Sequence, residues 1–529
     1  MHFAANSQAG IVHITWRKKR QKIESFPKND TWLRVYNKLL LFLYHINKNT
    51  MKTKTFFLTL ALMLGAISLS TSAQNTDWRA GVDRLMEQGE FKQAEKLMKS
   101  LPKKIRQQNA VTIDSLCQIM ERIRKDFRIT PEEGVKMIRE KYPATDAQIQ
   151  HWKDTRALEV MNIDGKEWWF RKSVGNLWLL GKEFKQQNDE DNYQSFLTRQ
   201  KYFREAMKSP ADACGTRDWR HVNITFYLDV NADAIPAGET LRVWMPYPYE
   251  NLRQKNIKLE GSNRPVTFSD PACKHHTVYM EAVAEKGKPT HFEYTFSYDV
   301  AERHISQQDL LAMVEPYKMT DEYKLYTSTE PPHIIITDKM RNLAREIVGK
   351  EENPVLQASM IYDWIVSRFP WAGAREYSTL TNIPEYVLLN NHGDCGQVGL
   401  LYITLARSLG IPARWESGWM LHPDEINWHD WAETYFEGVG WVPTDPSFGR
   451  SAYGTALNDY YKTGIDVYRM ASNEAVGQQL SPKKTFIRSE TVDFQPGEVE
   501  WKGGNLYYDH WKSHLEVNGI TPINNLIKR

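Results

Sequence analysis

The segment from 390 to 410, NNHGDCGQVGLLYITLARSLG, predicts a buried helix with a cysteine at its start. Gly410 and then Pro412 are typical of a helix end. Because Cys395 lies about one residue inside the helix start, free backbone N–H groups and the helix dipole are expected to favour its thiolate. The apolar stripe that buries this helix is Val398, Leu401, Tyr402, Leu405 and Leu409. Position alone leaves four roles for Cys395: buried filler, half of a disulfide, metal ligand or nucleophile.

A base for a nucleophilic cysteine is found downstream, in NWHDWAETYFEGVGWVPTDPSFG. Residues 428–436 alternate as a strand, 438–440 form a turn, and 441–445 form the returning strand. A hairpin register can therefore bring Asp445 beside His429. In such an arrangement His429 takes or shares the thiol proton, and Asp445 fixes the tautomer and supports the imidazolium. The candidate catalytic residues are Cys395, His429 and Asp445.

These motifs resemble the core of the transglutaminase-like superfamily, whose fold is similar to that of papain-like cysteine proteases. The resemblance covers about 340–450. It rests on Cys395 at a helix start, Gly-Ile-Pro-Ala-Arg at 410–414, His-Asp-Trp-Ala-Glu at 429–433, and Gly-Trp to Asp-Pro at 440–446. One departure is Asp430, where the family usually carries a small residue. As a strand neighbour of His429 it should point to the opposite face, so we expect it to have little effect.

The resemblance implies a secreted cysteine-dependent acyl-transfer enzyme. Cys395 would attack a peptide or carboxamide carbonyl and form a thioester, and the backbone N–H of Cys395 would bind the oxyanion. The second oxyanion donor stays open among Trp371, Tyr377 and Asn382. No cofactor is expected, and no calcium-binding loop pattern is present. A metal cluster of His422, Asp424, Glu425 and His429 is the weaker alternative, because His429 is better used as the base.

Three functions are compatible with these candidate residues. Hydrolysis, as in a peptidase or amidase, is favoured because nothing in the sequence excludes water from the thioester. Protein cross-linking, as in a transglutaminase, requires an amine to outcompete water. A non-catalytic glycan- or peptide-binding protein with a vestigial site is the third. The expected partner is a protein or peptide substrate, including one associated with the cell envelope or with glycans.

A secretory signal peptide is expected at 51–73, MKTKTFFLTLALMLGAISLSTSA. A basic start precedes an apolar run that is too short to span a bilayer as a stable helix, and a small-residue cleavage site follows. We therefore interpret 1–50 as an upstream over-extension, although 39–46 could instead belong to a membrane-proximal extension. The protein is expected to be secreted or periplasmic, without a stable membrane span in the mature chain.

The charge balance changes once these segments are removed. The whole chain has a net charge of +3. Residues 1–73 carry eleven Lys and Arg but two acidic residues, so the remainder has 57 basic and 63 acidic residues, a net charge of −6. No nucleic-acid partner is indicated.

The mature chain predicts a multi-domain α+β protein. Residues 77–210 read as a mainly helical region, with a hairpin turn at Asp164-Gly165. Strict alternation then predicts a β-sandwich at 215–302. The catalytic core is expected at 335–450, as a Cys-bearing helix packed on an antiparallel sheet, and strands at 451–529, including 485–501, are expected to cover it. Cys214 and Cys273 could be bridged, but the sequence does not decide this.

Overall fold

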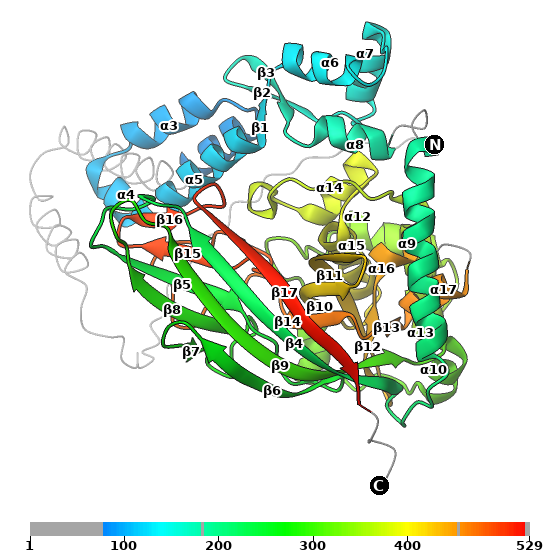
Figure 1. Ribbon diagram of the computed structural model, residues 1–529. Coiled ribbons are helices and arrows are strands. Elements are labelled where there is room, and N and C mark those ends of the chain that lie inside the picture. The colour runs from blue at the N-terminus through cyan, green and yellow to red at the C-terminus, as the bar shows by residue number, and fades with distance from the viewer. Residues whose placement is uncertain (1–77, 181–184, 452–454, 524–529) are drawn as a thin grey trace, which may run out of the picture. The chain divides into compact units, whose positions relative to one another are not determined.

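The structure of the protein is a computed structural model that describes residues 78–180, 185–451 and 455–523 (Figure 1). The expected signal peptide and the expected over-extension lie outside the described residues. None of the helices within those three ranges combines the length and the apolar character needed to cross a membrane. All four cysteines are free, so Cys214 and Cys273 are not bridged.

The N-terminal region combines helices with a small antiparallel sheet of order β1-β3-β2. The predicted hairpin between β2 and β3 is confirmed, since Asp164 and Gly165 both have positive φ at its turn. Capping boxes at Thr130 and Thr145 begin α6 and α7. The elements are α3 (Phe91–Ser100), α4 (Lys103–Gln108), α5 (Ala110–Asp126), β1 (Phe127–Ile129), α6 (Pro131–Arg139), α7 (Asp146–Asp154), β2 (Val160–Ile163), β3 (Lys166–Phe170), α8 (Ser173–Leu180) and α9 (Lys185–Ala206).

A β-sandwich follows, built of two five-stranded sheets. One has the order β13-β9-β4-β17 with β6 also paired to β9, and the other has the order β16-β15-β5-β8-β7. The alternation predicted its buried face, because every second side chain from Val222 to Val230 and from Phe292 to Val300 is at most 1% exposed. The strands within 215–304 are β4 (Thr216–Val230), β5 (Thr240–Pro246), β6 (Gln254–Ser262), β7 (Thr267–Phe268), β8 (Thr277–Val283) and β9 (Thr290–His304).

The C-terminal strands mostly complete the sandwich, and the expectation that the whole tail covers the core was wrong. Figure 1 shows the long strand β17 (Trp511–Pro522) beside β4, and β15 (Glu498–Trp501) pairs with β5. Without these partners β4 and β5 would have unpaired edges, which folded sheets avoid. β16 (Gly504–Leu506) extends this sheet, β13 (Gly464–Ile465) pairs with β9, and only β14 (Arg469–Asn473) joins the core sheet.

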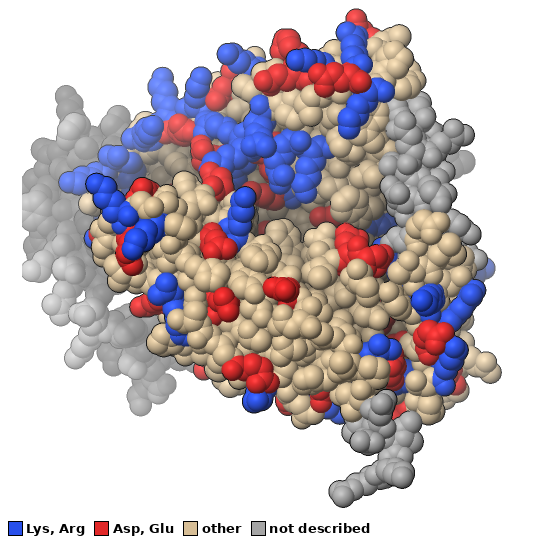
Figure 2. Space-filling view, viewed as in Figure 1, with Lys and Arg blue, Asp and Glu red and all other residues tan. Residues whose placement is uncertain are grey.

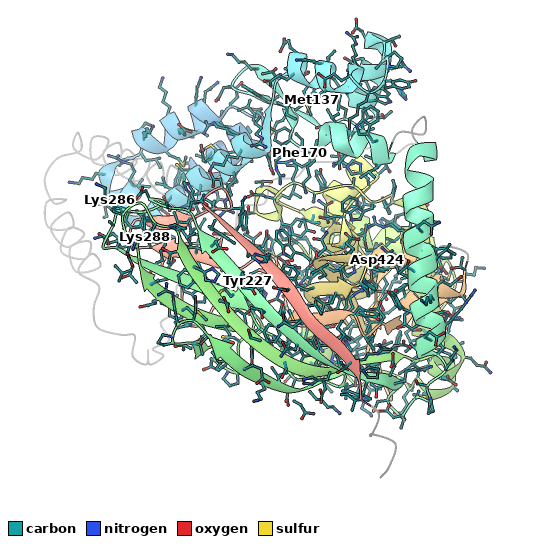
Figure 3. All side chains as sticks on the ribbon, viewed as in Figure 1. Met137, Phe170, Tyr227, Lys286, Lys288 and Asp424 are labelled. Atoms are coloured by element: carbon teal, nitrogen blue, oxygen red, sulfur yellow. The ribbon has the colours of Figure 1, made fainter. Side chains whose placement is uncertain are left out.

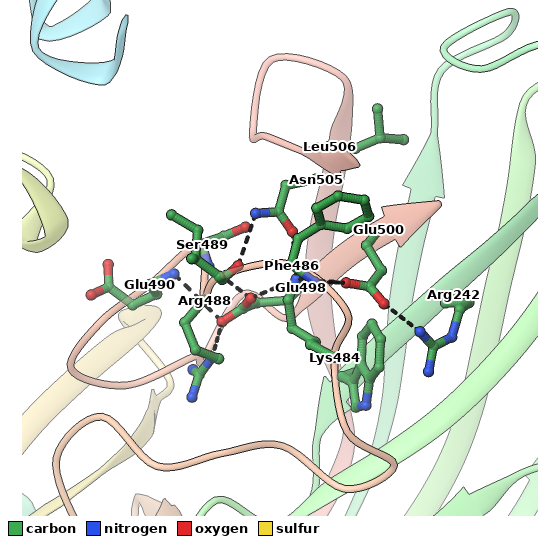
Figure 4. Close-up of polar contacts among 12 residues, drawn as sticks. Arg242, Lys484, Phe486, Arg488, Ser489, Glu490, Glu498, Glu500, Asn505 and Leu506 are labelled. Carbon is green, nitrogen blue, oxygen red and sulfur yellow. Dashed lines mark hydrogen bonds and ion pairs between the residues drawn. The ribbon is translucent and has the colours of Figure 1, made fainter. Parts of the chain in front are cut away.

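The segment before β15 was expected to be a strand from 485, but it is irregular up to Gly497. Figure 4 shows why it is held in another conformation: two carboxylates of β15 bind it. Glu498 accepts hydrogen bonds from Ser489 N and from Arg488, and Glu500 accepts them from the backbone N–H groups of 485 and 486. The backbone donors that a strand would use are thus bound to side chains.

The core places helices on a four-stranded sheet of order β12-β11-β10-β14. α15 (Cys395–Ser408) is buried along its length and contacts β11 (Glu425–Phe436) and β10 (Ala413–His422). Asn353 caps α13, and Pro354 is its first residue, the position in a helix where proline is favoured. The other elements are α10 (Gln307–Met313), α11 (Asp321–Tyr326), α12 (Asp338–Val348), α13 (Pro354–Arg368), η2 (Tyr377–Thr379), α14 (Ile383–Asn390), β12 (Gly440–Thr444), α16 (Pro446–Ser451) and α17 (Ala456–Lys462).

Candidate active site

Cys395 is the first residue of α15, and the turn before it is firmly held. Asp394 is the N-cap: its Oδ1 accepts from Gln397 N at 3.1 Å and from the Tyr377 hydroxyl at 2.6 Å. Arg450 donates to the carbonyl oxygen of Gly393 at 2.7 Å. The Cys395 side chain is partly exposed, so the thiol is fixed in position and still accessible.

The thiol hydrogen-bonds to Asp430, with Sγ 3.3 Å from Oδ2. Burial, followed by the charges of Asp430 and Asp394, raises the pKa of Cys395 well above its usual value. The helix start was expected to favour the thiolate, whereas burial and the two neighbouring carboxyl groups act in the opposite direction. Burial also raises the pKa of Asp430 to about 7.

His429 is buried on the other face of β11, and its Nε2 lies 2.7 Å from Asp445 Oδ2. Burial lowers the pKa of His429, although the charge of Asp445 opposes that shift. Burial would raise the pKa of Asp445, but His429 and Arg469 together lower it to about 2. Arg469 of β14 lies 3.3 Å from the same Asp445 oxygen. Asp445 is thus ionised at neutral pH and can orient the imidazole.

The structure brings His429 to Asp445 but does not hydrogen-bond Cys395 to His429 within the described residues. Asp430 does point to the face opposite His429, yet it contacts the thiol, so the expectation of little effect was wrong. β12 pairs with β11 only from Ala432 to Phe436. The edge of β11 at residues 429–430 is therefore not covered by β12, and the two faces of β11 that carry His429 and Asp430 adjoin at this edge.

Helix α16 connects the two halves of the site. It begins directly after Asp445, whose Oδ1 accepts from the backbone N–H groups of Ser447 and Phe448. The Phe448 ring packs edge-on against His429, with centroids 4.7 Å apart, and Arg450 binds Gly393 beside the nucleophile. Contacts from a single short helix therefore position both the imidazole and the turn that carries Cys395.

The residues considered for other roles have other contacts. The Tyr377 hydroxyl holds Asp394, and Asn382 caps α14 by accepting from Glu385 N. Trp371 is 48% exposed and lies beside Gly393 in a parallel bridge.

The residues of the alternative metal cluster are likewise dispersed. His422 Nε2 lies 3.2 Å from Asp466, and Asp424 lies at the turn between β10 and β11, near α9 (Figure 3). Among the described residues no group of three or more His, Cys, Asp or Glu side chains is arranged to hold a metal ion.

Sequence reasoning missed the groups that surround the triad candidates. Arg469, Asp493 and Gln495 come from the C-terminal part of the chain, which carries no motif. The N-terminal region also reaches this site: Asn176 makes two hydrogen bonds with the backbone of Gly373, and Asp126 accepts from Glu376 N. Lys and Arg side chains gather over this region above a hollow on the face shown in Figure 2.

Residues 341–446 match the model of the transglutaminase-like superfamily. An uncharacterized protein of Haemophilus influenzae is 25% identical over 291 residues, which cover 44% of this chain and 73% of that protein.

Two solved structures are also similar. A candidate cysteine protease from Cytophaga hutchinsonii has a TM-score of 0.41 at 15% identity and covers 59% of this chain and 93% of its own. The periplasmic domain of TgpA from Pseudomonas aeruginosa has a TM-score of 0.26 at 14% identity and covers 47% and 95%. From the family match together with the helix, sheet and motifs described above, residues 341–446 are a core domain of the transglutaminase-like superfamily.

Proposed function

We propose that this protein is a cysteine-dependent acyl-transfer enzyme that acts on peptide or carboxamide bonds, with hydrolysis as the main outcome. The family match supports a cysteine-dependent enzyme in general. The triad we propose is Cys395 as nucleophile, His429 as base and acid, and Asp445 as the group that orients the imidazole. The observation that carries this proposal is the buried 2.7 Å bond between His429 and Asp445, at the strand edge next to a helix-start cysteine.

The chemistry follows from these positions. Because Nε2 of His429 is bound to Asp445, Nδ1 is the ring nitrogen that would take the thiol proton. Cys395 Sγ then bonds to the carbonyl carbon, while the backbone N–H of Cys395 stabilises the oxyanion. The imidazolium gives its proton to the leaving amine as the C–N bond breaks, and a thioester forms. Water, deprotonated by His429, adds to the thioester carbon, and the thiol leaves with a proton.

Asp445 makes the imidazolium step favourable. A buried histidine resists protonation, and the lowered pKa of His429 reflects this cost. The ionised carboxylate at 2.7 Å offsets the cost at the moment the proton arrives. Arg469 helps to keep Asp445 ionised, so a negatively charged carboxylate lies beside His429 when the imidazolium forms.

We further propose that the enzyme works in the periplasm or is secreted. The basis is the signal peptide expected at 51–73. Expression of the full chain in a bacterium, followed by fractionation and N-terminal sequencing, tests this. Cleavage near Ala73 and recovery outside the cytoplasm are expected, whereas an uncleaved cytoplasmic protein would contradict it.

The activity is tested with the reduced mature protein, a peptide library and mass spectrometry, with and without a fluorescent primary amine. We expect cleaved or deamidated peptides with wild type and none with Cys395→Ala, and His429→Ala should be slower by about 10²–10⁴-fold. Predominant amine incorporation would assign the protein to cross-linking instead. Product formation by Cys395→Ala, or no product from any peptide with the wild type, would overturn the proposed function.

A further inference from the structure

The group that contacts the nucleophile in this structure is a carboxyl. Asp430 Oδ2 lies 3.3 Å from Cys395 Sγ, and no motif of the core assigns a role to this residue. Asp430 is 4% exposed, so its carboxyl group is largely shielded from water where it contacts the sulfur. A buried carboxyl in contact with a reacting sulfur must influence whether that sulfur carries a proton.

Asp430 is held by the irregular C-terminal segment. Gln495 Nε2 donates to Asp430 Oδ1, and the side chain of Asp493 lies close enough to act on the pKa of Asp430. Both residues are buried, at 3% and 5% exposed. Two buried carboxyl groups that lie close together cannot both ionise easily, so one of them tends to keep a proton. The segment that carries them is bound to β15 by the network of Figure 4, so the carboxyl pair is fixed over the thiol.

The charged and titratable groups facing this pair come from every neighbouring element. Those that act on Asp430, Asp493 or Cys395 are Asp394, the N-cap of α15, Cys395 of α15, Tyr377 of η2, Glu490 and Arg488 of the C-terminal segment, Arg450 of α16, and Lys172 before α8. Among these described groups, Asp430 makes the only hydrogen bond to the thiol.

We propose that Asp430 is a further catalytic residue, which as a carboxylate keeps the proton on Cys395 and as a carboxylic acid lets His429 remove it. This inference rests on the proposed function, because it concerns the same nucleophile. With Asp430 ionised, the thiol donates to Oδ2, and loss of its proton would place two negative charges in contact. With Asp430 protonated, the S–H proton passes to His429 Nδ1, giving a thiolate and an imidazolium while the Asp430 O–H donates to the sulfur.

The direction of the titrations supports this division of roles. The pKa of Asp430 is raised to about 7 by burial, so Asp430 becomes neutral below that pH. Burial lowers the pKa of His429 from its usual value, so the imidazole resists protonation further into acid than an ordinary histidine does. The two conditions overlap in mildly acidic solution, and we expect Cys395 to be most reactive relative to an ordinary thiol in that interval.

The test is the pH dependence of iodoacetamide labelling of the reduced mature protein, read by peptide mass spectrometry. The exposed Cys214 of the same molecule is the reference. In wild type, the ratio of Cys395 to Cys214 labelling should fall as the pH rises from 6 to 8. In Asp430→Asn, the ratio should not fall, and Cys395 labelling at pH 8 should rise about tenfold or more, since one pKa unit changes the thiolate fraction tenfold.

Two further variants control this result. Asp430→Ala removes the same charge without adding an amide and should act in the same direction. Glu376→Gln removes a neighbouring buried acid that makes no hydrogen bond to the thiol and keeps the backbone N–H that binds Asp126, so it should leave the wild-type ratio unchanged. The wild-type profile requires no variant, so it tests the proposal even if both Asp430 variants fail to fold.

A wild-type ratio that is constant or rises with pH would overturn the role of Asp430, as would slower labelling in Asp430→Asn at every pH. Labelling requires no substrate, so it is independent of the product assay. The expected labelling without any product would contradict the proposed function alone. Product formation that depends on Cys395, combined with an unchanged profile in Asp430→Asn, would contradict the Asp430 proposal alone.

Discussion

Gly396, the residue after the nucleophile, packs against the groups that build the site. A Cβ at this position would lie 2.3 Å from the Tyr377 hydroxyl, 2.6 Å from Asp430 Oδ2 and 2.9 Å from the Trp415 ring. The first two atoms are the ends of side chains, but each already makes a hydrogen bond in the site. The Tyr377 hydroxyl donates to Asp394, and Asp430 accepts from the Cys395 thiol. Gly396→Ala must therefore break site contacts in order to fit.

The expected magnitude follows from two opposing effects. Forcing an extra methyl group into a packed region costs about 1–3 kcal/mol. Replacing Gly by Ala within a helix stabilises the folded state by up to about 1 kcal/mol, because Ala has the higher helix propensity. The contacts at 2.3 and 2.6 Å place the cost in the upper part of its range, at about 2–3 kcal/mol, so the net effect of Gly396→Ala is a loss of about 1–2 kcal/mol in the free energy of unfolding. Labelling of Cys395 should change as well, because Asp430 is displaced.

Gly399, one turn further along α15, provides the matched control. A Cβ there meets only the Trp415 ring at 3.7 Å, which is an ordinary contact. Gly399→Ala should therefore keep or raise stability by up to about 1 kcal/mol. Urea denaturation, together with hydrogen exchange of peptides from α15, measures both variants. The reasoning is refuted if Gly396→Ala is as stable as wild type, or if the two variants lose the same stability.

Three other perturbations test separate parts of the structure. Asp445→Asn should lower kcat/KM by up to about 10⁴-fold, because the imidazole loses its orienting carboxylate; steady-state kinetics on a peptide substrate would contradict this with a loss below tenfold. Acid should destabilise the protein: Asp445 and Glu498, each with a pKa lowered to about 2, contribute about 2–3 kcal/mol apiece above pH 4.5, and these contributions are lost as the pH falls towards 2. A urea midpoint that stays constant from pH 5 to 2 would count against that. Removal of residues 511–523 should expose the edge of β4 and cause aggregation in size-exclusion chromatography, and a monomer of wild-type stability would be evidence against the role of β17.

Local patterns predicted the parts of the fold whose interactions are local. The alternation from Val222 to Val230 predicted a strand with one buried face, because side-chain direction in a strand follows from residue parity alone. The Asn353-Pro354 start of α13 is a local signal of the same kind, since a cap satisfies N–H groups within its own turn. Such features require no knowledge of the rest of the chain.

Features that depend on distant partners could not be predicted in this way. The segment from 485 has a composition suited to a strand, but Glu498 and Glu500 bind its backbone instead. Likewise, the local sequence shows Arg469 only as a charged residue in an ordinary strand. Its place in the site depends on the sheet order, in which β14 lies next to β10. No local signal marks either arrangement, because the competing interactions come from residues or strands that only the folded chain brings together.

Asp430 shows how a correct local prediction can lead to a wrong conclusion. Parity placed it on the face opposite His429, which is the case. The error was to assume that the nucleophile lies on the His429 face. α15 packs on the other face, where Tyr402 hydrogen-bonds to Thr434, so its first residue meets Asp430. In the mechanism that we propose, His429 would reach Cys395 around the edge of β11 that β12 leaves free, and the protonation state of Asp430 would decide when the proton is transferred.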